Sequence, residues 1–241
     1  MLERIEKLQI VMLGLLISIG LIIAVKLGVS SVAKNSVTVT GSAYEIVQSD
    51  SGSLEIVLNL RRPTKAIAYS EAKKQLPLVL EYLKSKGFDL DKDVDVKSMS
   101  GYVNYKYVNG MSTNEIAYYN LTQNISIKSN DVNKIKDTSL DISSLMEKGI
   151  DIDVQSTNYS YSKLSDLKVK LLEKATTDAK DRASAMLKST HNSVGNIQSV
   201  RMGVFQVTPV DSTDVSDMGI NDTSTIEKKI TAVANVVFQV K

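Results

Sequence analysis

Residues 54–60 read Leu-Glu-Ile-Val-Leu-Asn-Leu, and this stretch says more about the fold class than any other in the chain. The alternation places Leu54, Ile56, Leu58 and Leu60 on one face of an extended strand. The opposite face is mostly polar, as in a strand with one face in a core and the other in water. We therefore expect an antiparallel sheet that is covered on one side only.

The sequence just before this strand predicts a partner for it. Residues 37–40 (Val-Thr-Val-Thr) alternate in the same way. Between the two stretches, residues 50–53 predict a hairpin turn because Gly52 can adopt a positive φ. Two paired strands are thus expected before the first helix.

The rest of the chain alternates between helical and extended patterns. Pro77 interrupts the first helical pattern, so that helix either bends there or begins there. Residues 102–114 are expected to be a loop or a ragged hairpin. This order of elements predicts an α+β fold, with antiparallel sheet or sheets and helices packed on one face. We expect helices at 70–87, 130–149 and 162–190, and strands at 94–99, 118–127, 150–154, 197–207 and 230–240.

The polar segment between the last two strands, residues 208–225, is long for a plain connection. It is therefore expected to be either mobile or used for contact.

The chain opens with an apolar segment, residues 8–25, that contains no charged residue. A helix needs roughly 20 residues to cross the hydrocarbon core. We therefore predict a transmembrane anchor at 8–25, a cytoplasmic N-terminus at 1–7, a spacer at 26–36 and an extracytoplasmic domain at 37–241. The balance of flanking Lys and Arg favours this orientation only slightly.

A cleaved signal peptide is the alternative interpretation of the same segment. Ser31-Val32-Ala33 would provide the small residues at the cut, and the protein would then be secreted. We favour the uncleaved anchor because the apolar run is long for a signal and the candidate cut lies well beyond its end.

Composition excludes several functional classes. The 241 residues have a formal net charge of +2, and no basic stripe with interleaved aromatic residues is present, so nucleic-acid binding is not expected. The chain has no cysteine, which excludes disulfides, thiolate zinc sites and a thiol nucleophile.

The search for reactive groups predicts no catalytic, cofactor-binding or metal-binding residue. The alternating aspartates of residues 89–95 resemble a calcium loop, but Val94 stands where an EF-hand needs Gly and Ser100 where it needs Glu. The single histidine, His191, has no G-x-S-x-G nucleophile turn to serve and is better explained as a helix-end residue. Metalloprotease, Walker and dinucleotide motifs are absent. We therefore expect a protein that is not an enzyme; a hydrolase with an unrecognised site is the weakest of the alternatives.

Tyrosines gather in the middle of the chain. Tyrosine is favoured at protein interfaces because it is large, flat and amphipathic, although half-buried strands favour it as well. We take the cluster as the first candidate contact surface and residues 208–225 as the second. The cluster consists of Tyr102, Tyr105, Tyr107, Tyr118, Tyr119, Tyr159 and Tyr161.

Four separate stretches together resemble the SIMPL domain (DUF541) family. They are residues 37–43 (Val-Thr-Val-Thr-Gly-Ser-Ala), residues 93–98 (Asp-Val-Asp-Val-Lys-Ser), the alanine-rich residues 175–183 with the turn at 194–200, and the closing strand at 230–238. The likeness spans about residues 36 to 241. One departure is that the family usually has Gly at the end of the long helix, whereas this chain reads Ser189-Thr190-His191-Asn192. Asn192 is expected to supply the left-handed residue instead.

The resemblance implies an envelope or secreted protein of α+β fold. Some members of the family form large ring-like or channel-like homo-oligomers, and others are linked to tolerance of oxidative stress. The family has no established catalytic residues, so none is carried over to this chain.

Taken together, these features predict a non-enzymatic, membrane-anchored envelope component, structural or stress-related, that self-associates. The expected partners are the membrane, through the N-terminal helix, and further copies of the chain. The alternative is a monomeric extracellular module that binds a peptide, a glycan or a small ligand.

Overall fold

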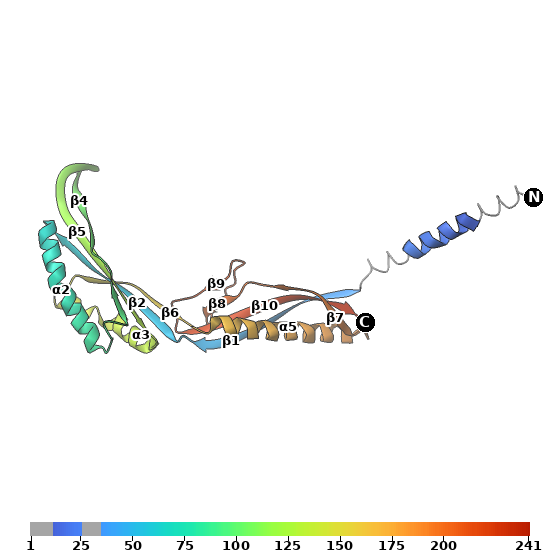
Figure 1. Ribbon diagram of the computed structural model, residues 1–241. Helices are drawn as coiled ribbons and strands as arrows, with labels where there is room; N and C mark the ends of the chain where they lie inside the picture. Colours follow the sequence, from blue (N-terminus) through green and yellow to red (C-terminus); the bar gives the residue numbers. More distant parts are fainter. Residues whose placement is uncertain (1–11, 26–34) are drawn as a thin grey trace, which may run out of the picture. The chain divides into compact units, whose positions relative to one another are not determined.

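The computed structural model describes residues 12–25 and 35–241 (Figure 1). Residues 12–25 form a helix, whereas residues 1–11 and 26–34, which include part of the predicted anchor and most of the spacer, lie outside the described residues. No helix within the described ranges is both long and apolar enough to cross a membrane.

The chain divides into two compact units, and each is built from segments that are distant in sequence. The first unit consists of the residues up to Ala43 together with Lys170–Val204 and Ala232–Lys241. The second unit consists of Tyr44–Val169 and Phe205–Thr231. Both combine antiparallel strands with helices, which confirms the predicted α+β class.

The second unit is built on a five-stranded antiparallel sheet. Its strands follow the order β3-β5-β2-β6, and β4 pairs with β5 beside β3. The strands are β2 (Ser51–Arg62), β3 (Val94–Val96), β4 (Ser100–Val108), β5 (Met111–Ser129) and β6 (Ile152–Ser160).

One face of this sheet carries the main core, as residues 54–60 predicted. Leu54, Ile56, Leu58 and Leu60 are completely buried. They pack with Ile125 and Ile127 of β5 and with α2 (Lys65–Ser85), α3 (Val132–Asp141) and α4 (Ser144–Glu147). The prediction that the first two strands pair as a hairpin is wrong: β1 (Ser36–Gln48) pairs with β10 (Glu227–Val240) in one sheet, whereas β2 pairs with β5 and β6 in the other. The two strands are joined at residues 49–50, and Gly52 lies within β2 beside the side chain of Ile135.

Helix α2 begins earlier than predicted. Thr64 is its N-cap, and the Thr64 hydroxyl accepts a hydrogen bond from the N–H of Ile67. Pro77 lies inside the helix, so the alternative in which the helix begins at Pro77 is wrong. The helix ends as expected at Gly87, whose φ of +82° allows the N–H of Phe88 to reach the carbonyl of Leu83.

The helix predicted at 130–149 is two short helices. Asp131 caps the start of α3 by accepting hydrogen bonds from the N–H groups of Asn133 and Lys134. A break around Ile142 separates α3 from α4, and it places both Ile142 and Leu145 in the core. The imperfect apolar stripe of this segment is therefore explained by a change of helix axis.

Most of α5 (Leu164–Lys188) belongs to the first unit, where the helix packs on the sheet through small residues. Ala175, Ala179 and Ala183 are fully buried, and β10 (Glu227–Val240) contributes buried residues such as Ala234. A Cβ atom on Gly41 of β1 would lie 2.1 Å from the carbonyl oxygen of Ala175. The alanines and Gly41 thus permit a closer approach of helix and strand than larger residues would allow.

The end of α5 explains the departure from the family pattern. His191, not Asn192, adopts the left-handed conformation, with a φ of +57°. The N–H of Asn192 then reaches the carbonyl of Leu187, as in a Schellman motif. The expectation for Asn192 was therefore wrong by one residue.

The strand predicted at 197–207 is two strands, β7 (Val194–Met202) and β8 (Gln206–Pro209), both of which pair with β10. In the same sheet, β1 lies beside β10, and the short β9 (Ile220–Asn221) runs parallel to β8.

Candidate interaction surface

Strands β4 and β5 continue past the end of their sheet as a two-stranded ribbon, residues 103–118 (Figure 1). The last residue pair between β2 and β5 is Arg62 and Tyr119, so β5 before Tyr119 pairs with β4 alone among the described residues. Asn109 and Gly110 form the tip, and both have positive φ values, 51° and 80°. This Asn-Gly turn is a strong hairpin signal, and the ragged hairpin expected here is a well-defined one.

The ribbon exposes large apolar side chains on both strands. Tyr107 is 73% exposed and Met111 is 71% exposed, on either side of the tip. A lone two-stranded ribbon is marginally stable in water, and exposed apolar residues on an unpaired strand favour contact with another chain. The other large exposed residues of the ribbon are Tyr105, Val108 and Ile116.

The structure brings five of the seven predicted tyrosines to this hairpin. Tyr102, Tyr105 and Tyr107 lie on β4, and Tyr118 and Tyr119 on β5. Because neighbouring residues of a strand point to opposite faces, Tyr118 and Tyr119 do not form one surface.

The other two tyrosines are placed elsewhere. Tyr159 lies on β6, is only 7% exposed and packs in the core, so it is not part of an exposed surface of this chain. Tyr161 follows β6 and is half-buried.

Beside the base of the ribbon, a hollow of about 400 Å³ opens between α2 and strands β4 and β5. Tyr69 of α2 and Tyr119 of β5 contribute to its lining, together with Leu121. Tyr69 is absent from the predicted set, because nothing in the sequence places the first turns of α2 next to β5.

The face of the sheet opposite the helices has an unsatisfied amide near the end of β2, close to the base of the ribbon. Asn120 stands between Tyr102 of β4 and Arg61 of β2 in the strand register. Its side chain is buried, and its Oδ1 has no hydrogen-bond partner in the part of the chain that the structure describes. The guanidinium of Arg61 lies 5.7 Å from the centre of the Tyr118 ring. The register thus places an amide oxygen that can still accept a hydrogen bond beside a tyrosine on the neighbouring strand, and this pair suits a ligand that has both apolar faces and hydroxyl or N–H donors.

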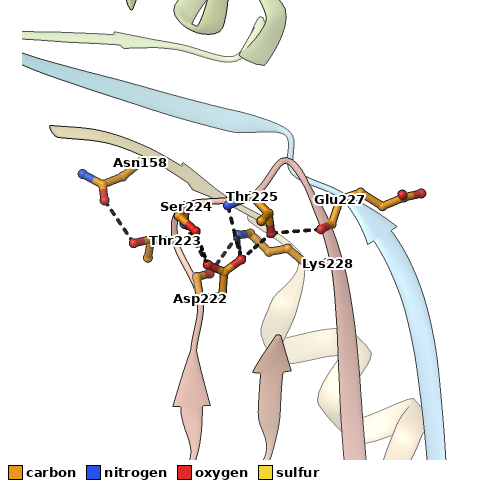
Figure 2. Close-up of polar contacts among 7 residues, drawn as sticks. All are labelled: Asn158, Asp222, Thr223, Ser224, Thr225, Glu227 and Lys228. Carbon is orange, nitrogen blue, oxygen red and sulfur yellow. Dashed lines mark hydrogen bonds and ion pairs between the residues drawn. The ribbon is translucent and has the colours of Figure 1, made fainter. Parts of the chain in front are cut away.

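The second predicted surface, residues 208–225, is held at its base by a buried ion pair (Figure 2). The ammonium group of Lys228, whose side chain is 3% exposed, lies 3.2 Å from Oδ2 of Asp222 and donates a hydrogen bond of 2.8 Å to the Asp222 carbonyl. Ser224 and Thr225 also donate hydrogen bonds to the Asp222 carboxylate. Burial alone would raise the pKa of Asp222, but these hydrogen bonds outweigh it and hold the pKa far below its ordinary value.

Further hydrogen bonds fix the middle of the same segment. The amide of Gln206 donates to the carbonyl of Ser216 over 2.7 Å, and Lys229 donates to the carbonyl of Ser212 over 2.6 Å. At the outer end, Val215 is 82% exposed and Met218 is 93% exposed. Fixed backbone with apolar side chains at its end is consistent with the contact role expected of this segment.

The other charged clusters serve the fold. Arg62 bonds Glu71 and lies 2.6 Å from Asp151, which also accepts a hydrogen bond from Gln75. Each charge in this network therefore has a partner, as a structural network requires.

The aspartate-rich loop, which contained the rejected calcium pattern, also has a local structural role. The carboxylate of Asp93 accepts a hydrogen bond from the N–H of Asp89, and that of Asp89 from the N–H of Asp91. Within the described ranges, no group of three or more His, Cys, Asp and Glu side chains is arranged to hold a metal ion.

Comparison with known families identifies the chain. The family model SIMPL, described as protein of unknown function (DUF541), matches residues 37–238. The match covers most of the sequence, and the chain belongs to the SIMPL family, as its four motif stretches indicated. No curated protein matches it.

The structure also shows why two of the family-like stretches occur together. Gly41, from the first stretch, lies against Ala175 and Ala179 of the alanine-rich one. The N–H of Ser42 donates to the carboxylate of Asp178 over 2.8 Å, and Asp178 pairs with Arg182. These residues join β1 to α5, so their role is to build the first unit.

Proposed function

We propose that this SIMPL protein is a non-enzymatic component of the cell envelope, anchored by its N-terminal apolar segment, whose extracytoplasmic domain self-associates through the β4–β5 ribbon. The ribbon carries the proposal because it presents Tyr105, Tyr107 and Met111 to solvent on strands with no partner but each other within the described residues. A second copy would remove this apolar area from water.

The ribbon has no net charge, and this also supports contact with the ribbon of a second copy. Its one ion pair joins Lys106 to Glu115 across the two strands, over 3.0 Å. The charges thus cancel within the ribbon, and two copies can meet without like-charge repulsion. Edge strands of natural proteins usually carry unpaired charged side chains that prevent pairing with another chain.

The test of self-association is the absolute mass of the fragment Asn35–Lys241, by size exclusion with light scattering. We expect a discrete multimer for the natural sequence and a smaller species for Tyr107→Ser. Tyr44→Ser is the matched control, because Tyr44 is 64% exposed but lies on β1, and it should leave the mass unchanged. A natural fragment that is monomeric at high concentration would contradict association by this domain.

The test of anchoring uses the full chain. We expect it to remain with membranes after alkaline carbonate extraction, and the N-terminal peptide recovered from it to begin before Ser31. A released chain beginning after Ala33 would instead establish cleavage and secretion.

A monomeric binding module is the second candidate, and the unpaired Oδ1 of Asn120 between Tyr102 and Arg61 favours it. Stacking on tyrosine together with hydrogen bonds to an amide suits a glycan. Titration of the fragment with chitotetraose, an acetamido sugar, tests this candidate. Binding that is lost in Tyr102→Ala, with a monomeric mass, would favour it over self-association.

A further inference from the structure

The hollow between α2 and strands β4 and β5 results from two small residues, one on the helix and one on the sheet. Ala68, in the first turns of α2, is fully buried and lines the hollow. Gly101 of β4 pairs with Leu121 and has no side chain to fill the space. A Cβ atom on Gly101 would lie 2.8 Å from the carbonyl oxygen of Asn120, so a larger residue there would have to displace β4 or β5. The space therefore follows from the backbone at these positions.

The floor of the hollow is apolar and belongs to the end of the main core. Leu121 is only 6% exposed, and Met99 packs against the core from a partly buried position. Val103 and Tyr119 form the strand pair two residues beyond Gly101 and Leu121, so all four lie on the face of the sheet that α2 covers. A hollow of about 400 Å³ is at the small end of the range of ligand sites. Its floor suits the apolar body of a small molecule.

Two partly exposed tyrosines line the hollow above this floor. Tyr69 of α2 is 47% exposed, and Tyr119 of β5 is half-buried. Neither hydroxyl has a hydrogen-bond partner among the residues that the structure describes. Aromatic side chains favour offset or edge-to-face contact with another ring. The two tyrosines therefore favour a planar aromatic ligand over an aliphatic one of the same size.

The charge of the hollow is positive. Of the described residues that line it, only Lys65, at the start of α2, is charged. The Lys65 ammonium group has no ion pair within the described ranges. The first turn of α2 contains no acidic residue, and a helix N-terminus carries a partial positive charge. A ligand that matches this end of the hollow therefore carries an anionic group.

We infer that the hollow binds a small aromatic carboxylate, whose ring contacts Tyr69 and Tyr119 and whose carboxylate accepts a hydrogen bond from Lys65. Because only one cation lines the hollow, a group with one negative charge matches it better than a phosphate monoester, which carries close to two. The site is separate from the exposed ribbon residues Tyr107 and Met111, so binding here requires no self-association.

The test is isothermal titration calorimetry of the full chain in phosphatidylcholine nanodiscs, with 2-naphthoate as the ligand and empty nanodiscs as the blank. We expect saturable binding of one naphthoate per chain. 2-Naphthamide, which has the same rings and no charge, is the matched ligand and should bind about tenfold more weakly. Naphthoate that gives no saturable heat, or that binds no better than naphthamide, would overturn the proposed site.

Two variants test the named residues in the same assay. Lys65→Met keeps the apolar stem and removes the charge, so it should weaken naphthoate binding about tenfold and leave naphthamide binding unchanged. Tyr69→Ala should weaken both ligands about fivefold, because it removes a ring contact. Lys74→Met is the matched control, since Lys74 is exposed on the same helix but does not line the hollow, and it should change neither affinity.

The outcomes at the hollow and at the ribbon are distinguishable. Circular dichroism of each variant verifies that it is folded. A folded Lys65→Met or Tyr69→Ala chain that binds naphthoate as tightly as the natural chain would overturn the site and leave the ribbon proposal standing. Tyr107→Ser should leave naphthoate binding unchanged, and Lys65→Met should leave the mass of the fragment Asn35–Lys241 unchanged.

Discussion

Both units of the molecule pack helices on antiparallel strands, but the second unit uses large apolar side chains at the contact and the first uses alanine and glycine. In the second unit, Leu58 and Ile125 fill the space between the sheet and helix α2, and the core gains its stability from apolar area. In the first unit, Ala175 and Ala179 pack directly against Gly41. These small residues bury little apolar area, but they allow the helix and the strand to approach each other closely. The second unit should therefore tolerate small additions of volume, whereas the first should not.

The largest expected effect is at Gly41. Gly41→Ala places a Cβ atom 2.1 Å from the Ala175 carbonyl oxygen and 2.4 Å from the Ala179 nitrogen, both backbone atoms that cannot move aside without displacing α5. We expect a loss of about 3 kcal/mol in the free energy of unfolding, measured by urea titration. The matched change in the second unit is Gly52→Ala, whose Cβ meets the Ile135 side chain at 3.1 Å and should cost about 1 kcal/mol. Equal losses at the two glycines would contradict the contrast between the units.

The next largest effect concerns the buried ion pair of Lys228 with Asp222 in the second unit, which we call the polar clasp. Lys228→Met removes the ammonium group and leaves the Asp222 carboxylate buried beside an apolar chain. We expect a loss of about 2–3 kcal/mol by thermal or urea unfolding, toward the low end for buried pairs because Ser224 and Thr225 still bond the carboxylate. The exposed ribbon pair supplies the control: Lys106→Met should cost less than about 0.5 kcal/mol. An unchanged free energy of unfolding in Lys228→Met would contradict a net contribution of the ion pair to stability.

The same clasp predicts a dependence of stability on pH. The pKa of Asp222 is lower in the folded chain than the value of about 3.9 in an unfolded one. Its contribution is therefore fully present above about pH 5 and is lost as the pH falls through 4 toward 2. Urea titrations at pH 7 and pH 3 should show a smaller loss on acidification for Asp222→Asn than for the natural chain, by about 1 kcal/mol. Identical losses would mean that Asp222 is not the group that titrates.

The smallest effect is expected at the helix ends. His191→Gly should raise the stability by about 1 kcal/mol, because His191 holds a φ of +57° that glycine adopts without strain. Gly87→Ala, at the corresponding end of α2 with a φ of +82°, should lower it by a similar amount. Thermal unfolding of both variants measures these two changes in stability. A destabilised His191→Gly would indicate that the imidazole itself contributes to the first unit.

Local sequence patterns predicted the structure correctly where a feature depends on a single strand or a single helix. The alternation of residues 54–60 predicted four buried leucine and isoleucine side chains, and all four are completely buried. The sequence indicated a loop or a ragged hairpin at residues 102–114, and the structure has a hairpin there that turns at Asn109-Gly110. Register shifts on either side of Tyr105 explain why the pattern there is irregular.

Contacts between distant segments were not predictable from the same patterns. Tyr159 resembles the other tyrosines in sequence, yet it lies in the core, because β6 pairs with β2 and places it among apolar residues. Conversely, Ile197 and Met202 lie in a segment that was predicted only as a strand, and they are half exposed because α5 covers β10 and not β7.

By itself, the sequence determined the α+β class, the SIMPL family and the inward face of the strand at residues 54–60, since periodicity and short motifs are local properties of the chain. Only the tertiary structure decided which of these residues remain exposed: the ribbon at Tyr107, the hollow beside Tyr69 and the buried partner of Asp222. The physical reason is that burial depends on which segments, far apart in sequence, come to lie against one another. A strand pattern records that one side is apolar, but it does not record whether a helix covers it.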